Sequence, residues 1–437
     1  MTTVYLILLT LFLVIGIKLC KIRKNNRFLY ELSPRLILVI SYFMYSVAMP
    51  ISRLFFASTE MSYDAEYMIV QILGALGILI GLSFQKYNVS FTSNRSSKQA
   101  SRIFLPLPAI IIMSAAVGVV IIGTIKDLGW SLSAVLKPYG YEVMVNTGTQ
   151  EQTLFGQILW VFAISSTVLA FIGANNTKNN RLILLTLLYG GLFGMLFMLR
   201  GSRMMSGMMI ITLICAYLFS KSIKIKYLLL SCVCIYLVVY IVGAVRNVGF
   251  ARLADVPIEI QMFDPLTQEF GANYIVFEKW KEMEQNSSLL LGKSYTIDVL
   301  YHMVPRYFWP DRPHGLSVQF ALDYFGLSDV SQIVRVFGFS PIVEALVNFG
   351  RLGIVPVFAL FSFLVALLES WLKRQGAWGT ACYAFMIFVM INWNRMDMAM
   401  LLKILIVYLV VSKVFATVMY PRRSTLYKIR THLAGTT

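Results

Sequence analysis

Long apolar runs restrict this chain to one kind of fold. Eleven of them are about the right length to cross a bilayer: 3–20, 34–54, 66–84, 103–124, 153–173, 182–199, 204–219, 227–245, 351–371, 377–394 and 397–420. A membrane-crossing helix needs roughly 20 apolar residues. Backbone polar groups in lipid must be bonded within the crossing segment, which favours helices. The sequence therefore predicts an all-α, polytopic membrane helix bundle of about 11 transmembrane helices. The first run lacks a basic leader and is read as an uncleaved span.

The loops between these runs alternate in charge. Loops on one side carry 19 basic residues, and the short loops on the other side carry five. Because basic loops tend to stay in the cytoplasm, we predict an N-terminus outside the cytoplasm and a cytoplasmic C-terminus. The net charge of +17 belongs mostly to these flanking loops, where it meets anionic headgroups, so it does not indicate nucleic-acid binding.

One long loop divides the chain into three parts. Residues 1–245 hold the first eight spans, residues 246–340 form a loop outside the cytoplasm, and residues 341–437 hold the last three spans and a cytoplasmic tail. Phe270, Tyr274 and Phe277 recur at helical spacing within the loop, and a second half-apolar stretch covers 289–304. We expect amphipathic helices there, lying over the bundle.

Isolated arginines lie on the outer side, against the usual charge bias. Arg200 and Arg203 occupy the tip of a tight hairpin, and Arg246 begins the long loop. Fixed guanidinium groups suit a polyanion or a lipid pyrophosphate. The alternative is that the hairpin arginines extend to lipid headgroups.

A proline-rich strip spans residues 304–315. Its prolines favour an extended path, along which Arg306, Tyr307, Trp309, Arg312 and His314 follow one another. Such a strip suits sugar stacking beside phosphate pairing, or else its aromatic residues anchor in the membrane interface. A histidine can titrate near neutral pH, but His314 is a lone histidine, which is more often structural than catalytic.

A capped helix start follows at Ser340 and Pro341. Glu344, Asn348 and Arg351 would share one face of this helix. Glu344 is our candidate general base. Alternatively, its carboxylate satisfies helix N–H groups or pairs with an arginine.

No metal or cofactor is expected. The sequence has no Walker-type loop, no H-E-x-x-H and no D-x-D pattern. The five cysteines lie in apolar runs without a C-x-x-C pair, which argues against zinc and disulfides.

Three motifs occur in a fixed order: the hairpin Arg200–Arg203, the strip from Val304 to Pro313 preceded by Tyr295, and the segment from Ser340 to Gly353. In this order they resemble the Wzy-type O-antigen polymerases, bacterial inner-membrane proteins that polymerise oligosaccharide repeat units. The matching stretch covers roughly residues 195–370.

The resemblance implies a GT-C-like glycosyltransferase on the periplasmic face of the bacterial inner membrane. Its substrates would be oligosaccharide repeats on undecaprenyl pyrophosphate, and the growing chain would be transferred onto a new lipid-linked unit. A separate Wzz-type co-polymerase would set the chain length. Glu344, Arg200 and Arg203 are the expected catalytic residues. The residues expected to bind substrate are Arg246, Arg306, Arg312, Arg351, Asn348, His314, Tyr307 and Trp309.

Two other functions remain open. An O-antigen ligase uses the same donor with a lipid A–core acceptor. A flippase or exporter would move the same lipid-linked sugar without chemistry, although such transporters usually show internal repeats and charges at mid-membrane.

Overall fold

The computed structural model describes residues 2–20, 22–24, 27–29, 32–56, 65–84, 103–127, 152–199, 203–219, 270–283, 288–304, 308–309, 311–328 and 338–421. Ten helices coincide with ten of the predicted spans: α1 (Thr2–Leu19), α2 (Pro34–Phe56), α3 (Ala65–Ser83), α5 (Pro106–Asp127), α8 (Gln152–Thr177), α9 (Asn180–Leu199), α10 (Arg203–Leu218), α17 (Pro341–Leu372), α18 (Gly376–Asn392) and α19 (Met398–Met419). The predicted span 227–245 lies outside the described residues.

Seven of the described helices are long and apolar enough to cross a membrane, namely α3, α5, α8, α9, α17, α18 and α19. Shorter apolar stretches lie in α1, α2 and α10. The expectation of a multi-pass helical membrane protein is therefore confirmed. The number of 11 spans stays a prediction.

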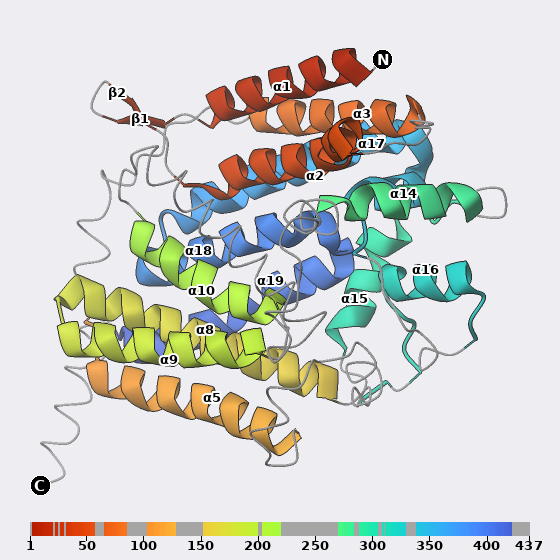
Figure 1. Cartoon of the computed structure of the whole chain (residues 1–437). Helices are drawn as coiled ribbons and strands as arrows, with labels where there is room; N and C mark the ends of the chain where they lie inside the picture. The colour runs from red at the N-terminus through yellow and green to blue at the C-terminus, as the bar shows by residue number, and fades with distance from the viewer. Residues whose placement is uncertain are drawn as a thin grey trace, which may run out of the picture.

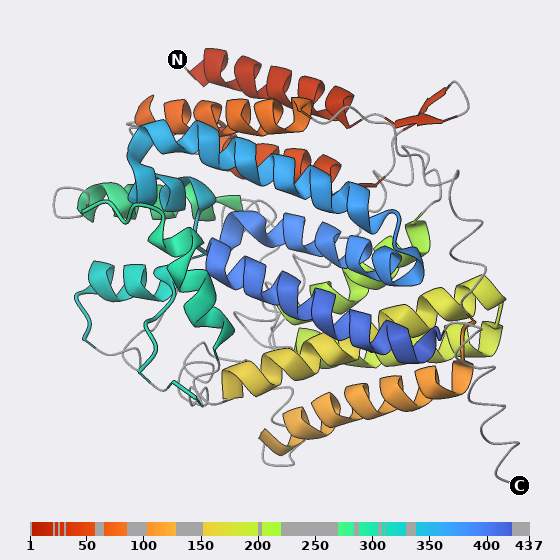
Figure 2. The same cartoon turned by 180° about the vertical axis from the view of Figure 1, so that it is seen from behind.

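The long helices run side by side, and small elements gather at their two ends (Figures 1 and 2). At one end lie α14 (Ala272–Met283), α15 (Ile297–Met303) and α16 (Leu316–Phe325), together with the beginning of α1. At the other end β1 (Ile22–Lys24) and β2 (Arg27–Leu29) form an antiparallel hairpin, so the described chain is helical apart from this hairpin. We call the α14–α16 end the loop end.

The predicted amphipathic helix in the long loop is present as α14. Tyr274, Phe277 and Trp280 are all buried. Tyr67 of α3 makes edge-on ring contacts with Tyr274 and Phe277, at centroid separations of 5.0 and 5.4 Å. The apolar stripe of α14 therefore packs on the bundle itself.

Close packing joins α3 to α17. A methyl group at Gly77 would lie 2.6 Å from the carbonyl oxygen of Val355, so only glycine permits this approach. Nearby, the Ser362 hydroxyl donates a hydrogen bond to the Ile78 carbonyl, at 3.2 Å. The hydrophobic effect contributes little to the association of helices in lipid. Close packing at small residues and hydrogen bonds between helices stabilise the contact instead.

The helix α17 is broken near its beginning. Gly350 has φ 66° and ψ −167°, a backbone conformation that is essentially restricted to glycine. The break separates a short first helix, which carries Glu344 and Asn348, from the membrane-spanning remainder that begins at Arg351. The two parts therefore present their side chains in unrelated directions.

We expect Gly350→Ala to destabilise the protein by about 1–3 kcal/mol, because the new side chain forces a strained backbone. No atom lies within 4 Å of the added methyl group, so the loss would come from the backbone alone. Thermal unfolding in detergent measures it. Gly118→Ala in α5 is the matched control, since its methyl group also meets nothing within 4 Å, and there we expect a neutral or stabilising change. Equal stability of the two variants would contradict the argument.

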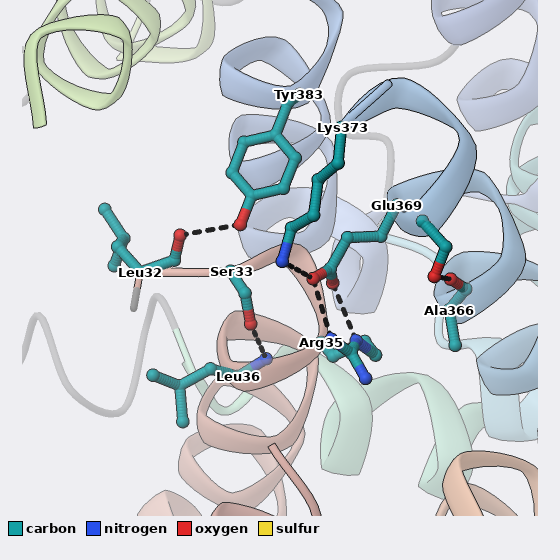
Figure 3. Close-up of polar contacts among 9 residues, drawn as sticks. Leu32, Ser33, Arg35, Leu36, Ala366, Glu369, Lys373 and Tyr383 are labelled. Carbon is teal, nitrogen blue, oxygen red and sulfur yellow. Dashed lines mark hydrogen bonds and ion pairs between the residues drawn. The ribbon is translucent and has the colours of Figure 1, made fainter. Parts of the chain in front are cut away.

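A buried ionic triad lies at the end of the bundle opposite the loop end, where the end of α17 meets the beginning of α2 (Figure 3). Arg35 Nε and Nη2 donate to the two carboxylate oxygens of Glu369, each at 2.7 Å. Lys373 Nζ lies 2.9 Å from Glu369 Oε1. The three side chains are at most 2% exposed, so these charges were removed from solvent when the helices packed.

Candidate functional site

Glu344 lies at the loop end in the first turn of α17 and is 1% exposed. The Ser294 hydroxyl donates to Glu344 Oε1 at 2.7 Å, and the backbone N–H of Met398 donates to Oε2 at 2.9 Å. As predicted, the helix begins at Pro341 with Ser340 at the N-cap position, although the Ser340 side chain makes no capping hydrogen bond. Glu344 thus links three elements: α17, the beginning of α19 and the short helix η3 (Lys293–Tyr295).

Asn348 completes the attachment of η3. Its Nδ2 donates to Ser294 Oγ and to the Glu344 carbonyl oxygen, each at 2.7 Å. Just before η3, the N–H groups of Leu290 and Leu291 donate to the carbonyls of Val347 and Asn348, at 3.0 and 2.9 Å. The segment 290–295 is therefore tied along the first turns of α17.

Asp397 is the N-cap of α19. Its Oδ1 accepts the Met400 N–H at 2.8 Å, and its Oδ2 accepts the Ser317 hydroxyl at 2.9 Å. Glu344 accepts the N–H of Met398 at the same helix end. A helix N-terminus carries partial positive charge and favours carboxylates. Two buried carboxylates consequently share one helix N-terminus.

The helix α15 adds a third acid. Asp298 is 8% exposed, and burial raises its pKa; the charge of Asp397 acts in the same direction and Lys293 opposes it. Both Asp298 and Asp397 are close enough to Glu344 to act on it electrostatically. His302 lies one turn after Asp298. Its Nε2 atom lies beside Gly315, because a methyl group on Gly315 would be 2.8 Å from it. Asp397 Oδ2 would be 3.4 Å from the same methyl group.

Arg351 does not share the face of Glu344 and Asn348, which corrects the prediction. The break at Gly350 turns it away, and its guanidinium pairs with Glu66 of α3. Lys281 of α14 lies 3.4 Å from the same carboxylate. The prediction from helical spacing was wrong here because Gly350, with its positive φ, interrupts the helix. Positions on its two sides therefore no longer share a face.

Arg312 is buried rather than presented to solvent. Its Nη1 donates to the carbonyls of Tyr301, His302 and Val304, at 3.1, 3.2 and 2.8 Å. These carbonyls form the C-terminal end of α15, where a cation is favourable. In this structure Nη1 of Arg312 therefore holds the end of α15.

The structure describes only some of the remaining predicted site residues. Trp309 is 37% exposed and meets the Tyr301 ring edge-on at 5.1 Å, and His314 is partly buried just before α16. Arg203 begins α10, but its side chain lies outside the description. Arg200, Arg246, Arg306 and Tyr307 also lie outside the described residues.

Sequence reasoning missed two partners of Glu344. Ser294 and the N–H of Met398 come from distant segments, and no pattern linked them to Glu344. A weak signal was present for α15, since Asp298 and His302 lie four residues apart. Helical spacing in an apolar stretch indicates one shared face, but it does not identify what that face contacts.

Within the described part of the chain, no group of three or more His, Cys, Asp or Glu side chains is arranged to hold a metal ion. Comparison with known proteins adds no assignment: no family model, no curated protein and no solved structure matches this chain.

Proposed function

We propose that this protein polymerises oligosaccharide repeat units carried on undecaprenyl pyrophosphate, as the Wzy-type polymerases do. The proposal places it in a bacterial inner membrane, with the N-terminus and the loop end on the periplasmic side and the C-terminus in the cytoplasm. The ordered motifs support it, and so does the presence of Glu344 and its neighbouring acids at the loop end.

The observation that carries the proposal is the buried pair Glu344 and Asp397. Within the described residues their hydrogen bonds come from hydroxyl and backbone N–H groups, and not from a basic side chain. Removing carboxylates from water is costly, so a fold rarely keeps such groups for stability alone. Buried acids grouped in this way are typical of sites that move protons.

The proposed reaction is a single glycosyl transfer. The oxygen of an acceptor sugar hydroxyl forms a bond to the anomeric carbon of the growing chain. The bond from that carbon to the pyrophosphate oxygen breaks, and its electron pair leaves with undecaprenyl pyrophosphate. The hydroxyl proton passes to the carboxylate of Glu344, which acts as general base. Because Glu344 is 1% exposed, the acceptor reaches its carboxylate only after a local rearrangement around that side chain.

The leaving pyrophosphate needs charge stabilisation, which fixed arginines supply. We propose Arg200 and Arg203 for this task, with Arg246 and Arg306 as further substrate contacts. No resident cofactor is required by this scheme, and we propose that it is independent of metal ions. A chain-length co-polymerase would be the protein partner.

Purified protein in liposomes with lipid-linked repeat units provides the test. We expect a ladder of polymers without added lipid A–core, and the same ladder in EDTA. Product formation only after lipid A–core is added would indicate a ligase instead. Movement of the lipid-linked unit across the bilayer without new glycosidic bonds would indicate a flippase.

A further inference from the structure

Tyr295 carries a buried hydroxyl group without a hydrogen-bond partner among the described residues. It is the last residue of η3, and its ring stacks on Phe349 with centroids 6.1 Å apart and planes 6° from parallel. Stacking fixes the direction of the ring and therefore the position of the hydroxyl. Among the described residues, no hydrogen bond from the hydroxyl itself helps to hold it in place.

The residue that carries this hydroxyl adjoins a hydrogen-bond partner of the candidate base. Tyr295 directly follows Ser294, whose side chain donates to Glu344. Burial raises the pKa of Tyr295 well above its ordinary value, and the negative charge of nearby Glu344 adds to the effect. The phenol therefore stays protonated and keeps its ability to donate.

A hydroxyl buried without a partner opposes folding, because its bond to water is lost and not replaced. Phenylalanine would provide the same stacking surface without this cost. The presence of the hydroxyl is explained if it gains a hydrogen-bond partner during function. A sugar or phosphate oxygen at Glu344 would be such a partner.

We propose that the Tyr295 hydroxyl donates a hydrogen bond to the reacting hydroxyl oxygen of the acceptor sugar and holds it beside Glu344. Tyr295 is then a substrate-contacting residue that leaves the proton of the acceptor free to pass to the carboxylate. This inference rests on the proposed polymerase function and names a contact within its site.

The test is Tyr295→Phe, measured for polymer formation, for KM and kcat, and for thermal unfolding. We expect polymerisation to fall roughly 10- to 100-fold, as the loss of one well-placed hydrogen bond implies. We also expect a melting temperature equal to or above that of the unchanged protein, because the unpaired hydroxyl is gone.

Tyr420→Phe is the matched control. The Tyr420 hydroxyl is also buried, but it donates to the Leu169 carbonyl at 2.7 Å and lies at the far end of α19 from Glu344. Its removal should lower the melting temperature and leave kcat and KM unchanged. Tyr295→Phe is therefore expected to lower activity without lowering the melting temperature, and Tyr420→Phe to lower the melting temperature without lowering activity.

Three results overturn the inference. If Tyr295→Phe lowers the melting temperature as Tyr420→Phe does and keeps full activity, the hydroxyl is structural and bonds to a buried water. If the unchanged protein makes no polymer from lipid-linked units, the proposed function fails and this contact fails with it. Full activity of Tyr295→Phe beside an inactive Glu344→Gln removes this contact alone.

Discussion

Glu369→Leu is expected to destabilise the protein by about 3–5 kcal/mol, the usual loss when one partner of a buried ion pair is removed. The change leaves Arg35 and Lys373, both at most 2% exposed, facing one another without the carboxylate between them. Thermal unfolding in detergent measures the effect, and a loss this large also lowers the yield of folded protein.

Two control variants separate the triad from ordinary charge pairs. Arg35→Met leaves one cation and one anion, so it should cost less than Glu369→Leu, which leaves two cations. Glu282→Ala removes an exposed partner of Lys279 and should cost at most about 1 kcal/mol. If Arg35→Met proves as damaging as Glu369→Leu, the net charge of the triad is not what governs its stability.

Glu344→Gln is expected to lower polymer formation by about 10²- to 10⁴-fold, the usual contribution of a general base. Gln retains the shape and accepts one of the two hydrogen bonds now made by Ser294 and Met398. The lost bond is offset by the removal of a buried charge, so we expect a melting temperature close to that of the unchanged protein. Ladder formation and thermal unfolding are measured on the same preparation.

Ser294→Ala distinguishes a base from an anchor. It removes one hydrogen bond to Glu344 but leaves the carboxylate, so a catalytic Glu344 keeps most of its activity in this variant. If Glu344→Gln polymerises at nearly the unchanged rate, Glu344 only anchors η3 and α19. The base would then be sought at Asp397, Asp311 or His314.

Much of the fold was predictable because apolar runs in lipid have few alternatives. The positions of ten predicted spans agree with ten helices, and the aromatic spacing of Tyr274 and Phe277 correctly indicated α14. Local rules also placed the beginning of α17 at Pro341. The hairpin of β1 and β2 was not predicted, since it lies in a short loop without a strand-length pattern.

The site was predictable only in its local part. Glu344 and Asn348 lie one turn apart on a short helix, so periodicity brought them together. Arg351 was assigned to the same face, but the positive φ of Gly350 ended that helix and directed Arg351 to Glu66. Arg312 was expected to face a substrate, yet its Nη1 binds the carbonyls that end α15.

The sequence by itself determined the class of this protein, because the cost of unpaired backbone groups in lipid makes each long apolar run a helix. Only the tertiary structure decided which polar groups meet. Ser294 lies 50 positions before Glu344, and Met398 lies 54 positions after it. Arg35 lies 334 positions before Glu369. The packing of helices that are distant in the sequence determines such partners, because it buries a polar or charged group that then needs a hydrogen bond. A local sequence pattern does not show which distant residue provides it.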